Sequence, residues 1–525
     1  MHWWQSAVLY QVYPRSFQDT NGDGVGDLRG IVERLPHLAE LGVDALWLSP
    51  IFASPMADFG YDISDYTAID PLFGSLRDFD TLLTAAHARG IKVLLDLVPN
   101  HTSDRHPWFV ESRVSRQSAK RDWYIWRDGA PGGGPPNNWL SEFGGSAWQF
   151  DAATGQYYYH AFLAAQPDLN WRNAQVREAM HEVMRFWLRR GVDGFRVDVI
   201  WHLIKDDAFR DNPPNPDFRD GDPSYRRLNP LYSTDRPEVH DVVRGLRGVI
   251  DEFPDRVLIG EIYLPVERLV AYYGRELSGT HLPFNFSLLE TVWQPRAIAQ
   301  VVDRYEAALP QGAWPNWVLG NHDRPRLVTR VGAEQARVAA VLLMTLRGTP
   351  TLYYGDEIGM HQVAMAPEQV RDPWEKNVPG LGRDGCRTPM QWDAQRFAGF
   401  SAVEPWLPLP DDYLNVNVAS ERADPKSLYN LYRRLVALRR ACAALTQGAY
   451  RPVAVSGDLL AFERAADGRR VLIALNFAAL PVILALPGDA SGGTVLVSSE
   501  GRDGENLSGS FALQGHEGAV IELAP

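Results

Sequence analysis

The sequence predicts an α/β fold in which a (β/α)8 TIM barrel carries an inserted subdomain and is followed by a C-terminal antiparallel β-sandwich. Apolar strand-like runs alternate with amphipathic helical stretches along most of the chain, as in repeated βα units. The alternation stops once, after the third strand, and gives way to short β-like runs near the C-terminus. We therefore expect residues 1–100 and 171–446 to form the barrel, 101–170 the inserted subdomain and 447–525 the C-terminal domain.

Three strands are predicted before the insertion. They are expected at residues 7–17, 43–49 and 92–98. Helices are expected at residues 27–41, where leucine and isoleucine recur at helical spacing, and 76–89. From residue 101 to about 170 the chain is rich in Gly, Pro, Asn and aromatic residues and shows no clear period.

Five more strands are predicted after the insertion, at residues 192–200, 257–263, 281–286, 314–319 and 349–354. The helices between and around them are expected at residues 176–190, 238–253, 267–273, 296–308, 334–346 and 427–442. Right-handed crossovers place every such helix outside the sheet, so eight strands close most simply into a barrel. The β-like runs of the last domain lie at residues 459–462, 471–475, 482–486, 494–497 and 518–523.

Composition and charge exclude several functional classes. The 52 Lys and Arg residues against 65 Asp and Glu give a net charge of −13, which repels nucleic acid and anionic membranes, so neither is an expected partner. The longest aliphatic run is far shorter than the roughly 20 residues that span a bilayer. Two cysteines, no export signal and no zinc pattern favour a soluble cytoplasmic protein with reduced thiols. The oligomeric state stays open.

Three acidic residues follow apolar runs at predicted strand ends: Asp198, Glu261 and Asp323. Active sites of barrels form at the carboxyl ends of the strands, where a buried carboxylate is costly unless the site uses it. One such residue is readily explained as a salt bridge or a helix cap, but three together indicate a catalytic centre. Paired carboxylates divide the work of glycoside hydrolysis between a nucleophile and an acid/base.

The local sequence suggests how the roles divide. Arg196 lies two residues before Asp198 on the same face of the strand and can keep that aspartate ionised, which favours Asp198 as nucleophile. Glu261 has no cation within two positions and apolar neighbours, which favours a raised pKa and an acid/base role. His101 and His322 lie at two other strand ends, where each could bind sugar hydroxyls or cap a loop.

Four segments carry a resemblance to the alpha-amylase family of glycoside hydrolases. They are DLVPNH at 96–101, GFRVDVI at 194–200, GEIY at 260–263 and VLGNHD at 318–323. QPDLN at 166–170 and GTPTLYYGDEIGM at 348–360 add to the likeness, which extends from residue 3 to about 449. The chain most resembles the alpha-glucosidase and oligo-1,6-glucosidase branch, which implies the same barrel, insertion and C-terminal β domain.

The resemblance implies that Asp198 is the nucleophile, Glu261 the acid/base and Asp323 a carboxylate that binds sugar hydroxyls and stabilises the transition state. It also implies which residues bind the terminal glucose: Asp58, Tyr61 as a stacking platform, His101, Gln166, Arg196, His322, Arg383 as the partner of Asp58, and Arg387 as the second choice for that partner.

The segment DTNGDGVGD offers oxygen ligands at alternate positions: Asp19, Asn21, Asp23, the carbonyl of Val25, and Asp27. Hard oxygen donors suit Ca²⁺, with Mg²⁺ as the alternative, although Gly30 at the twelfth position excludes an EF-hand. The resembled branch carries a structural calcium in this loop; the other interpretation is a turn that only caps the helix from Asp27. No organic cofactor is expected.

These observations favour an exo-acting, retaining alpha-glucosidase that releases glucose from short alpha-glucosides and can also transfer it. The alternative is a glucosyltransferase or isomerase resembling trehalose synthases and sucrose isomerases. A non-catalytic interaction module is a remote possibility, disfavoured because all three carboxyl residues are present. An endo-acting amylase is disfavoured because Asp58 and Arg383 suggest a closed pocket, and Val199 leaves both α-1,4 and α-1,6 linkages open.

Overall fold

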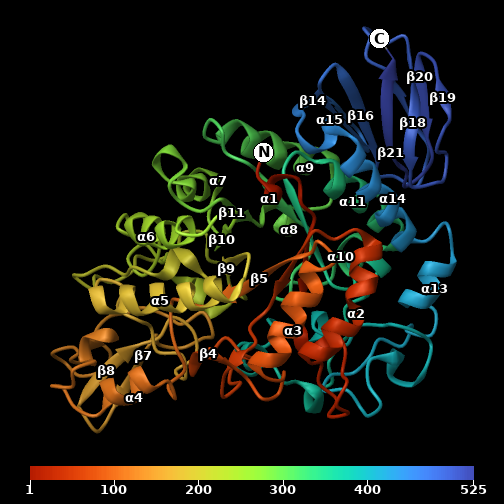
Figure 1. Ribbon diagram of the computed structural model, residues 1–525. Coiled ribbons are helices and arrows are strands. Elements are labelled where there is room, and N and C mark those ends of the chain that lie inside the picture. Colours follow the sequence, from red (N-terminus) through yellow and green to blue (C-terminus); the bar gives the residue numbers. More distant parts are fainter. Residues whose placement is uncertain (525) are drawn as a thin grey trace.

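The computed structural model describes residues 1–524 and has the three predicted parts, a barrel, an insertion and a C-terminal domain. The inserted region and the C-terminal domain lie on opposite sides of the barrel (Figure 1). The parallel strands of the barrel are β1 (Leu9–Val12), β2 (Ala45–Leu48), β5 (Lys92–Leu97), β9 (Gly194–Val197), β10 (Val257–Ile262), β11 (Leu282–Asn285), β12 (Asn316–Val318) and β13 (Thr349–Tyr353). The TIM-barrel prediction is confirmed.

Side-chain hydrogen bonds join the two edge strands of the barrel, which are not paired with each other through backbone hydrogen bonds. The strand order is β11-β10-β9-β5-β2-β1-β13-β12, so β11 and β12 are the two edges. Asn316 on β12 joins them: its Oδ1 accepts the N–H of Asn285 at 2.9 Å, and its Nδ2 donates to the carbonyl of Pro283 at 2.5 Å. The interior of the barrel is filled by apolar side chains from six of its strands, including Trp47 on β2 and Phe284 on β11.

The outer helices begin and end at residues suited to those positions. They are α2 (Leu28–Leu41), α3 (Leu76–His87), α5 (Ala174–Arg190), α6 (Val239–Asp251), α9 (Pro295–Ala308), α11 (Ala333–Thr345) and α14 (Leu428–Ala441). Asp27 caps α2 by accepting the N–H of Gly30 at 2.8 Å, and Asn173 caps α5. Both helices end at a glycine with positive φ, Gly42 at 92° and Gly191 at 108°.

All eight barrel strands are shorter than predicted, and the fourth, expected at 192–200, is only Gly194–Val197. The first strand ends at Val12 because Pro14 starts a 3₁₀ turn, Pro14–Ser16. The helix predicted at 267–273 is one turn of α-helix, α7 (Val266–Leu269), followed by the 3₁₀ turn Val270–Tyr273. Gly274, with φ 75°, ends that segment.

The inserted region contains regular structure that its composition does not reveal. Its elements are α4 (Pro107–Arg113), β6 (Trp126–Arg127), β7 (Trp148–Asp151) and β8 (Gln156–Tyr159), the strands forming an antiparallel sheet in the order β6-β8-β7. Aromatic side chains around Trp139 and Trp148 fill its small core. A second short hairpin, β3 (Phe52–Ala53) and β4 (Asp65–Ile69), follows β2 and carries the segment with Asp58 and Tyr61.

The C-terminal domain consists of two antiparallel sheets. The larger is β14-β15-β16-β21-β18-β19 and the smaller pairs β17 with β20. Their bounds are β14 (Ala449–Ser456), β15 (Leu459–Ala466), β16 (Arg469–Asn476), β17 (Val482–Ala485), β18 (Gly492–Ser498), β19 (Asn506–Leu507), β20 (Ser510–Leu513) and β21 (Gly518–Ala524). The prediction missed β14, β19 and β20, which lack a continuous apolar run. No helix within residues 1–524 is long and apolar enough to cross a membrane.

Candidate active site

A cavity of about 410 Å³ opens at the carboxyl ends of the barrel strands. Eight of the residues that the sequence singles out line it: Asp58, Tyr61, His101, Asp198, Glu261, His322, Asp323 and Arg383. Gln166, Arg196 and Arg387 lie directly behind this lining and hold it through hydrogen bonds and ion pairs. The predicted site residues therefore come together in one place, from strands and loops far apart in the chain.

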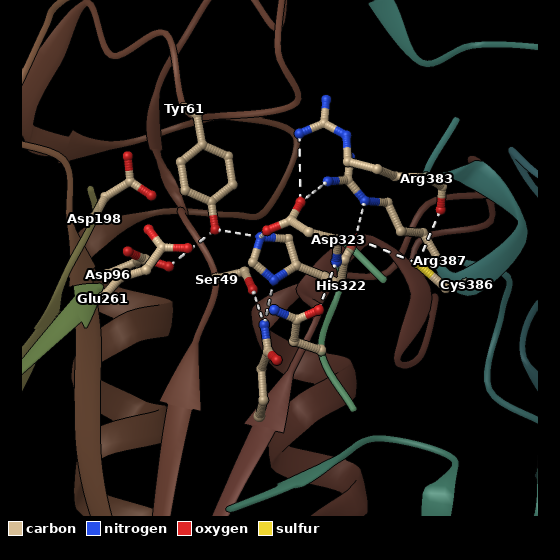
Figure 2. A network of polar contacts seen from close by, with 12 residues as sticks. Ser49, Tyr61, Asp96, Asp198, Glu261, His322, Asp323, Arg383, Cys386 and Arg387 are labelled. Atoms are coloured by element: carbon tan, nitrogen blue, oxygen red, sulfur yellow. Dashed lines mark hydrogen bonds and ion pairs between the residues drawn. The ribbon is translucent and has the colours of Figure 1, made fainter. Parts of the chain in front are cut away.

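Arg196 on β9 is the centre of a buried group of three carboxyls. Its Nη1 lies 2.7 Å from Asp96 Oδ1 and 2.7 Å from Asp198 Oδ1, and its Nη2 lies 2.9 Å from Glu261 Oε1. Strand register explains the meeting, since Asp96 on β5 pairs with Arg196 and the next residues of β9 run beside Gly260 and Glu261 of β10. The carboxyls of Asp96, Asp198 and Glu261 lie together beside Tyr61 (Figure 2).

No cation lies within two sequence positions of Glu261, but Arg196 contacts it in space from the neighbouring strand. The pKa of Glu261 is nevertheless raised by burial, in the predicted direction. A second contact fixes the other oxygen of this residue: Glu261 Oε2 accepts the N–H of Val199 at 2.8 Å. Val199 has φ 37°, a left-handed conformation that is strained for a β-branched residue, and it follows Asp198 directly.

Burial raises the pKa of Asp198 and of Glu261, while Arg196 acts to lower both. Burial also raises the pKa of Asp96 to about 6, again against Arg196. Three carboxyls thus share one guanidinium, and ionising all three would leave two negative charges without compensation in a buried site. The arrangement favours one retained proton in the group, which is what a pair made of a nucleophile and an acid requires.

Asp323 stands in the opposite electrostatic environment. Burial disfavours its charge, but the close contact with the neutral His322 ring and the two cations Arg387 and Arg383 outweigh burial and hold its pKa well below its usual range. Arg387 Nη2 lies 2.8 Å from Asp323 Oδ1, and Arg383 Nη1 lies 3.4 Å from the same oxygen. Asp323 therefore remains an ionised hydrogen-bond acceptor facing the cavity.

The two candidate arginines have different partners. Arg383 Nη2 lies 2.6 Å from Asp58 Oδ1, whereas Arg387 pairs with Asp323. Arg383 is also held by Asp372, whose Oδ1 lies 2.7 Å from Nη2 and whose Oδ2 lies 2.9 Å from Nε. Asp372 is fully buried, and these contacts lower its pKa to about 2 despite burial. The sequence analysis missed Asp372, since it lies in the irregular excursion 360–425 with no periodic signal.

His322 and Tyr61 form a stacked, hydrogen-bonded pair. Their ring centroids are 5.5 Å apart, and Tyr61 Oη lies 2.7 Å from His322 Nε2. Tyr61 Oη also donates to Asp96 Oδ2 at 3.0 Å, while Gln11 Nε2 lies 2.7 Å from His322 Nδ1. One face of Tyr61 is thus packed on His322, and its hydroxyl belongs to the network around Arg196 (Figure 2).

His101 and Gln166 support the side of the cavity near Asp58. Gln166 Nε2 lies 3.2 Å from His101 Nε2 and donates to Asp58 Oδ2 at 3.3 Å. Burial lowers the pKa of His101 to about 4, so the ring is neutral near pH 7. A neutral imidazole beside a carboxylate and an amide can exchange hydrogen bonds with hydroxyl groups without adding charge.

The rest of the cavity wall comes from segments that sequence patterns did not identify. Glu142, Phe143 and Phe162 belong to the inserted region, and the other unexpected lining residues include Trp201, Tyr225, Arg226, Tyr263, Glu290, Arg324 and Trp374. Most lie on loops after the strands, where no period marks them. The cavity therefore has a polar floor near Arg196 and a more aromatic outer wall.

The family model described as "Alpha amylase, catalytic domain" matches residues 11–448. The chain belongs to the alpha-amylase family of glycoside hydrolases. It is 46% identical over 492 residues to a probable alpha-glucosidase of Rhizobium meliloti (strain 1021), covering 90% of this chain and 89% of the relative. It is 38% identical to an oligo-1,6-glucosidase of Halalkalibacterium halodurans, with 99% and 98% covered. These relatives belong to the branch that the motifs predicted.

Among solved structures, an alpha-glucosyl transfer enzyme superimposes with a TM-score of 0.94 at 42% identity, covering 99% of this chain and all of that one. The family, its glycosidase branch and the barrel fold are therefore established independently of the motifs.

The predicted metal loop of this family member is closed by its own hydrogen bonds. Asp19 Oδ2 accepts the N–H of Gly24 at 2.9 Å, Asp23 Oδ1 accepts that of Val25 at 2.8 Å, and Asp27 caps α2. Across residues 1–524, no three His, Cys, Asp or Glu side chains are grouped as a metal site would require. The carboxylate, amide and carbonyl oxygens of the loop are the kind of ligands that Ca²⁺ takes. Calcium binding in this loop stays a prediction.

Proposed function

We propose that the protein is an exo-acting, retaining alpha-glucosidase that releases alpha-glucose from the non-reducing end of short alpha-glucosides. The observation that carries this proposal is the pair Asp198 and Glu261, both bound to Arg196 at the floor of a cavity whose side is closed by Asp58 and Arg383. The family membership supports the reaction class, and the resemblance of the motifs supports the roles of Asp198 as nucleophile and Glu261 as acid/base.

Asp198 attacks the anomeric carbon in the first step, while Glu261 gives its proton to the departing glycosidic oxygen. A covalent beta-glucosyl ester on Asp198 results. In the second step Glu261 takes a proton from water, the water oxygen attacks the anomeric carbon, and the Asp198 carboxylate leaves with net retention. The contacts of Arg196 with Asp198 and Glu261 favour one retained proton among the buried carboxyls. This supports a start of the reaction with Asp198 ionised and Glu261 protonated.

Retention requires carboxyls about 5 to 5.5 Å apart, against roughly 6.5 to 9.5 Å for inversion. One guanidinium contacts both carboxyls, with Arg196 Nη1 2.7 Å from Asp198 Oδ1 and Nη2 2.9 Å from Glu261 Oε1. Two carboxyls held by one guanidinium lie close together, which supports the retaining route.

The remaining polar groups fit a transition state with positive charge on the sugar. Asp323, kept ionised by Arg387 and Arg383, accepts hydrogen bonds from sugar hydroxyls and stabilises that charge. His101 and His322 are both kept neutral by burial and exchange hydrogen bonds with other hydroxyls. The Asp58–Arg383 pair forms a wall beyond the terminal glucose, which supports attack on chain ends only.

The test is to follow the anomer of the released glucose by NMR during the first minutes of hydrolysis. Alpha-glucose should appear first, before mutarotation. Beta-glucose as the first product would overturn the retaining assignment. A maltoheptaoside capped at its non-reducing end should stay intact, and cleavage of it would overturn the exo assignment.

Transfer of glucose to a second sugar is the other candidate outcome of the second step. The structural likeness to an alpha-glucosyl transfer enzyme favours including it. Maltose, isomaltose, sucrose, trehalose and starch, with products resolved over time, separate hydrolysis from transfer or isomerisation and determine the preferred linkage. We further infer a cytoplasmic location, which the two free, buried cysteines Cys386 and Cys442 support.

A further inference from the structure

A side chamber of about 320 Å³ adjoins the catalytic cavity. The two share six lining residues: Glu142, His202, Tyr225, Arg226, Pro230 and Thr234. The remaining chamber lining is mixed: Asn212, Asn215, Ser233 and Tyr159 are polar, and Leu140, Ala161 and Leu228 are apolar. A chamber of this size with several hydroxyl and amide groups suits a small polyhydroxylated ligand.

Glu142 stands at the junction of the two spaces. Its backbone N–H donates to the carbonyl of Ala161 at 2.9 Å, and the neighbouring Ser141 hydroxyl donates to the carbonyl of Phe162 at 2.6 Å. The backbone of this turn is therefore held in place. The carboxyl of Glu142, in contrast, has no hydrogen bond and no ion pair with any of residues 1–524.

Arg226 lines both spaces from the opposite segment, which lies between β9 and α6. It acts on Glu142 electrostatically but makes no ion pair with it within residues 1–524. The two walls are fastened together nearby: Asn138 Nδ2 donates to the carbonyl of Asn212 at 2.9 Å, and Asn138 Oδ1 accepts the N–H of Asn212 at 2.8 Å. The inserted region and the segment after β9 are therefore joined beside the chamber.

We propose that Glu142 is a specificity-determining residue that accepts hydrogen bonds from the sugar unit on the reducing side of the bond that is cut, with Arg226 as its facing donor. The inference rests on the proposed function and deepens it. That sugar is the leaving group in disaccharide cleavage and the acceptor in transfer, so the same contact serves both directions. An aglycone without hydroxyl groups cannot donate a hydrogen bond to Glu142.

The pH dependence follows from the surroundings of Glu142. Burial raises the pKa of its carboxyl to about 7, and Arg226 acts to lower it. The other titratable groups facing it are Tyr225, Tyr159 and His202. Burial lowers the pKa of His202 and raises the pKa of both tyrosines, so all three are uncharged near pH 7. A carboxylate accepts stronger hydrogen bonds than a carboxylic acid, so sugar selectivity should rise as pH increases through about 7.

The test compares kcat/KM for maltose and isomaltose with kcat/KM for p-nitrophenyl alpha-glucoside, in the unaltered protein and in Glu142→Ala and Glu142→Gln. Because the substrates share the glucosyl half, the ratio isolates the reducing-side unit. We expect Glu142→Ala to lower the disaccharide-to-aryl ratio about tenfold, with kcat/KM for the aryl substrate within about threefold of the unaltered protein. Glu142→Gln should retain part of the ratio and lose its rise with pH.

Two further variants sharpen the test. Glu111→Gln makes the same chemical change at an exposed position of the inserted region and should leave the ratio unchanged. Arg226→Gln removes the cation that lowers the pKa of Glu142, so the pH midpoint of the ratio should move upward. A purely structural role for Glu142 would move both substrates together and would not produce these pH shifts.

An unchanged ratio in Glu142→Ala and Glu142→Gln would overturn the inference while leaving the proposed function intact. Cleavage of the aryl glucoside but of neither disaccharide by the unaltered protein would also overturn it alone. Failure to cleave any alpha-glucoside would overturn the proposed function and this inference together.

Discussion

Replacing Asp58 by alanine should separate the binding of the terminal glucose from the chemistry. Asp58 makes a 2.6 Å ion pair with Arg383, and both side chains are buried. Arg383 would not be left without compensation, because Asp372 still contacts it at 2.7 and 2.9 Å. The change therefore removes charge-assisted hydrogen bonds rather than stranding a buried cation.

A hydrogen bond to a charged group contributes about 1.5 to 3 kcal/mol. Loss of one such bond to the terminal glucose in the transition state corresponds to about a 10- to 150-fold fall in kcat/KM. Stranding Arg383 altogether would cost about 3 to 5 kcal/mol and would destabilise the fold as well. We therefore expect Asp58→Ala to lose activity strongly while its Tm falls only slightly.

The assay measures kcat/KM for maltose, together with Tm by calorimetry, for Asp58→Ala, Asp58→Asn and the control Asp65→Ala. Asp65 is exposed and bonds only to its own loop through Thr67, so its removal should leave kcat/KM unchanged. A kcat/KM of Asp58→Ala within about twofold of the unaltered protein would refute the reasoning. A drop in Tm as large as that of an Asp372 variant would show that Asp58 stabilises Arg383 as much as Asp372 does, against the expectation stated above.

Three other predictions follow from the same contacts. Asp198→Ala and Glu261→Gln should each lower kcat by several orders of magnitude, measured with maltose, and retention of more than about a tenth of the activity would contradict the assigned role. Asp372→Asn should lower Tm near pH 7. The pKa of Asp372 is depressed to about 2 in the folded protein, so the ionised carboxylate contributes about 2 kcal/mol to the free energy of unfolding. This contribution is present above about pH 4 and is lost as pH falls toward 2. The Tm difference from the unaltered protein should therefore shrink between pH 5 and pH 3, and a constant difference would exclude the ionic explanation. Chelation should lower Tm more than initial activity if Ca²⁺ or Mg²⁺ binds the loop at Asp19 to Asp27; elemental analysis without either metal and an unchanged Tm would remove the metal prediction.

Much of the barrel was predictable because its signals are local. A buried strand is an apolar run, and a helix on its surface repeats every three or four residues, so seven of the eight strands appear close to their expected positions. The first strand and the helix after β10 were overextended, since Pro14 and Gly274 end regular structure without changing the apolar pattern nearby. The helix and sheet of the inserted region were missed because their core consists of aromatic residues in no fixed period.

The polar floor of the site was predictable for a related reason. Asp96, Arg196, Asp198 and Glu261 lie on or directly after strands, and parallel strands in register bring equivalent positions to the same edge. One contact could not be read from sequence distance: Arg196 lies 65 positions from Glu261 in the chain, but its Nη2 is only 2.9 Å from Glu261 Oε1. A pKa argument limited to near neighbours in sequence could not include that contact.

The outer wall follows a different rule, and this difference matters for specificity. Glu142 comes from the inserted region, Arg226 from the segment after β9 and Trp374 from the excursion after β13, so no single motif contains two of them. In the proposed function the floor acts on the glucosyl unit that every alpha-glucoside shares, and it is built from strand ends whose positions the barrel fixes. Under the further inference the wall contacts the part of the substrate that differs between alpha-glucosides, and the wall is built from loops that can change without disturbing the barrel. Substitutions on the floor should therefore reduce activity toward all alpha-glucosides together, whereas substitutions at Glu142 and Arg226 should change the order of preference among them.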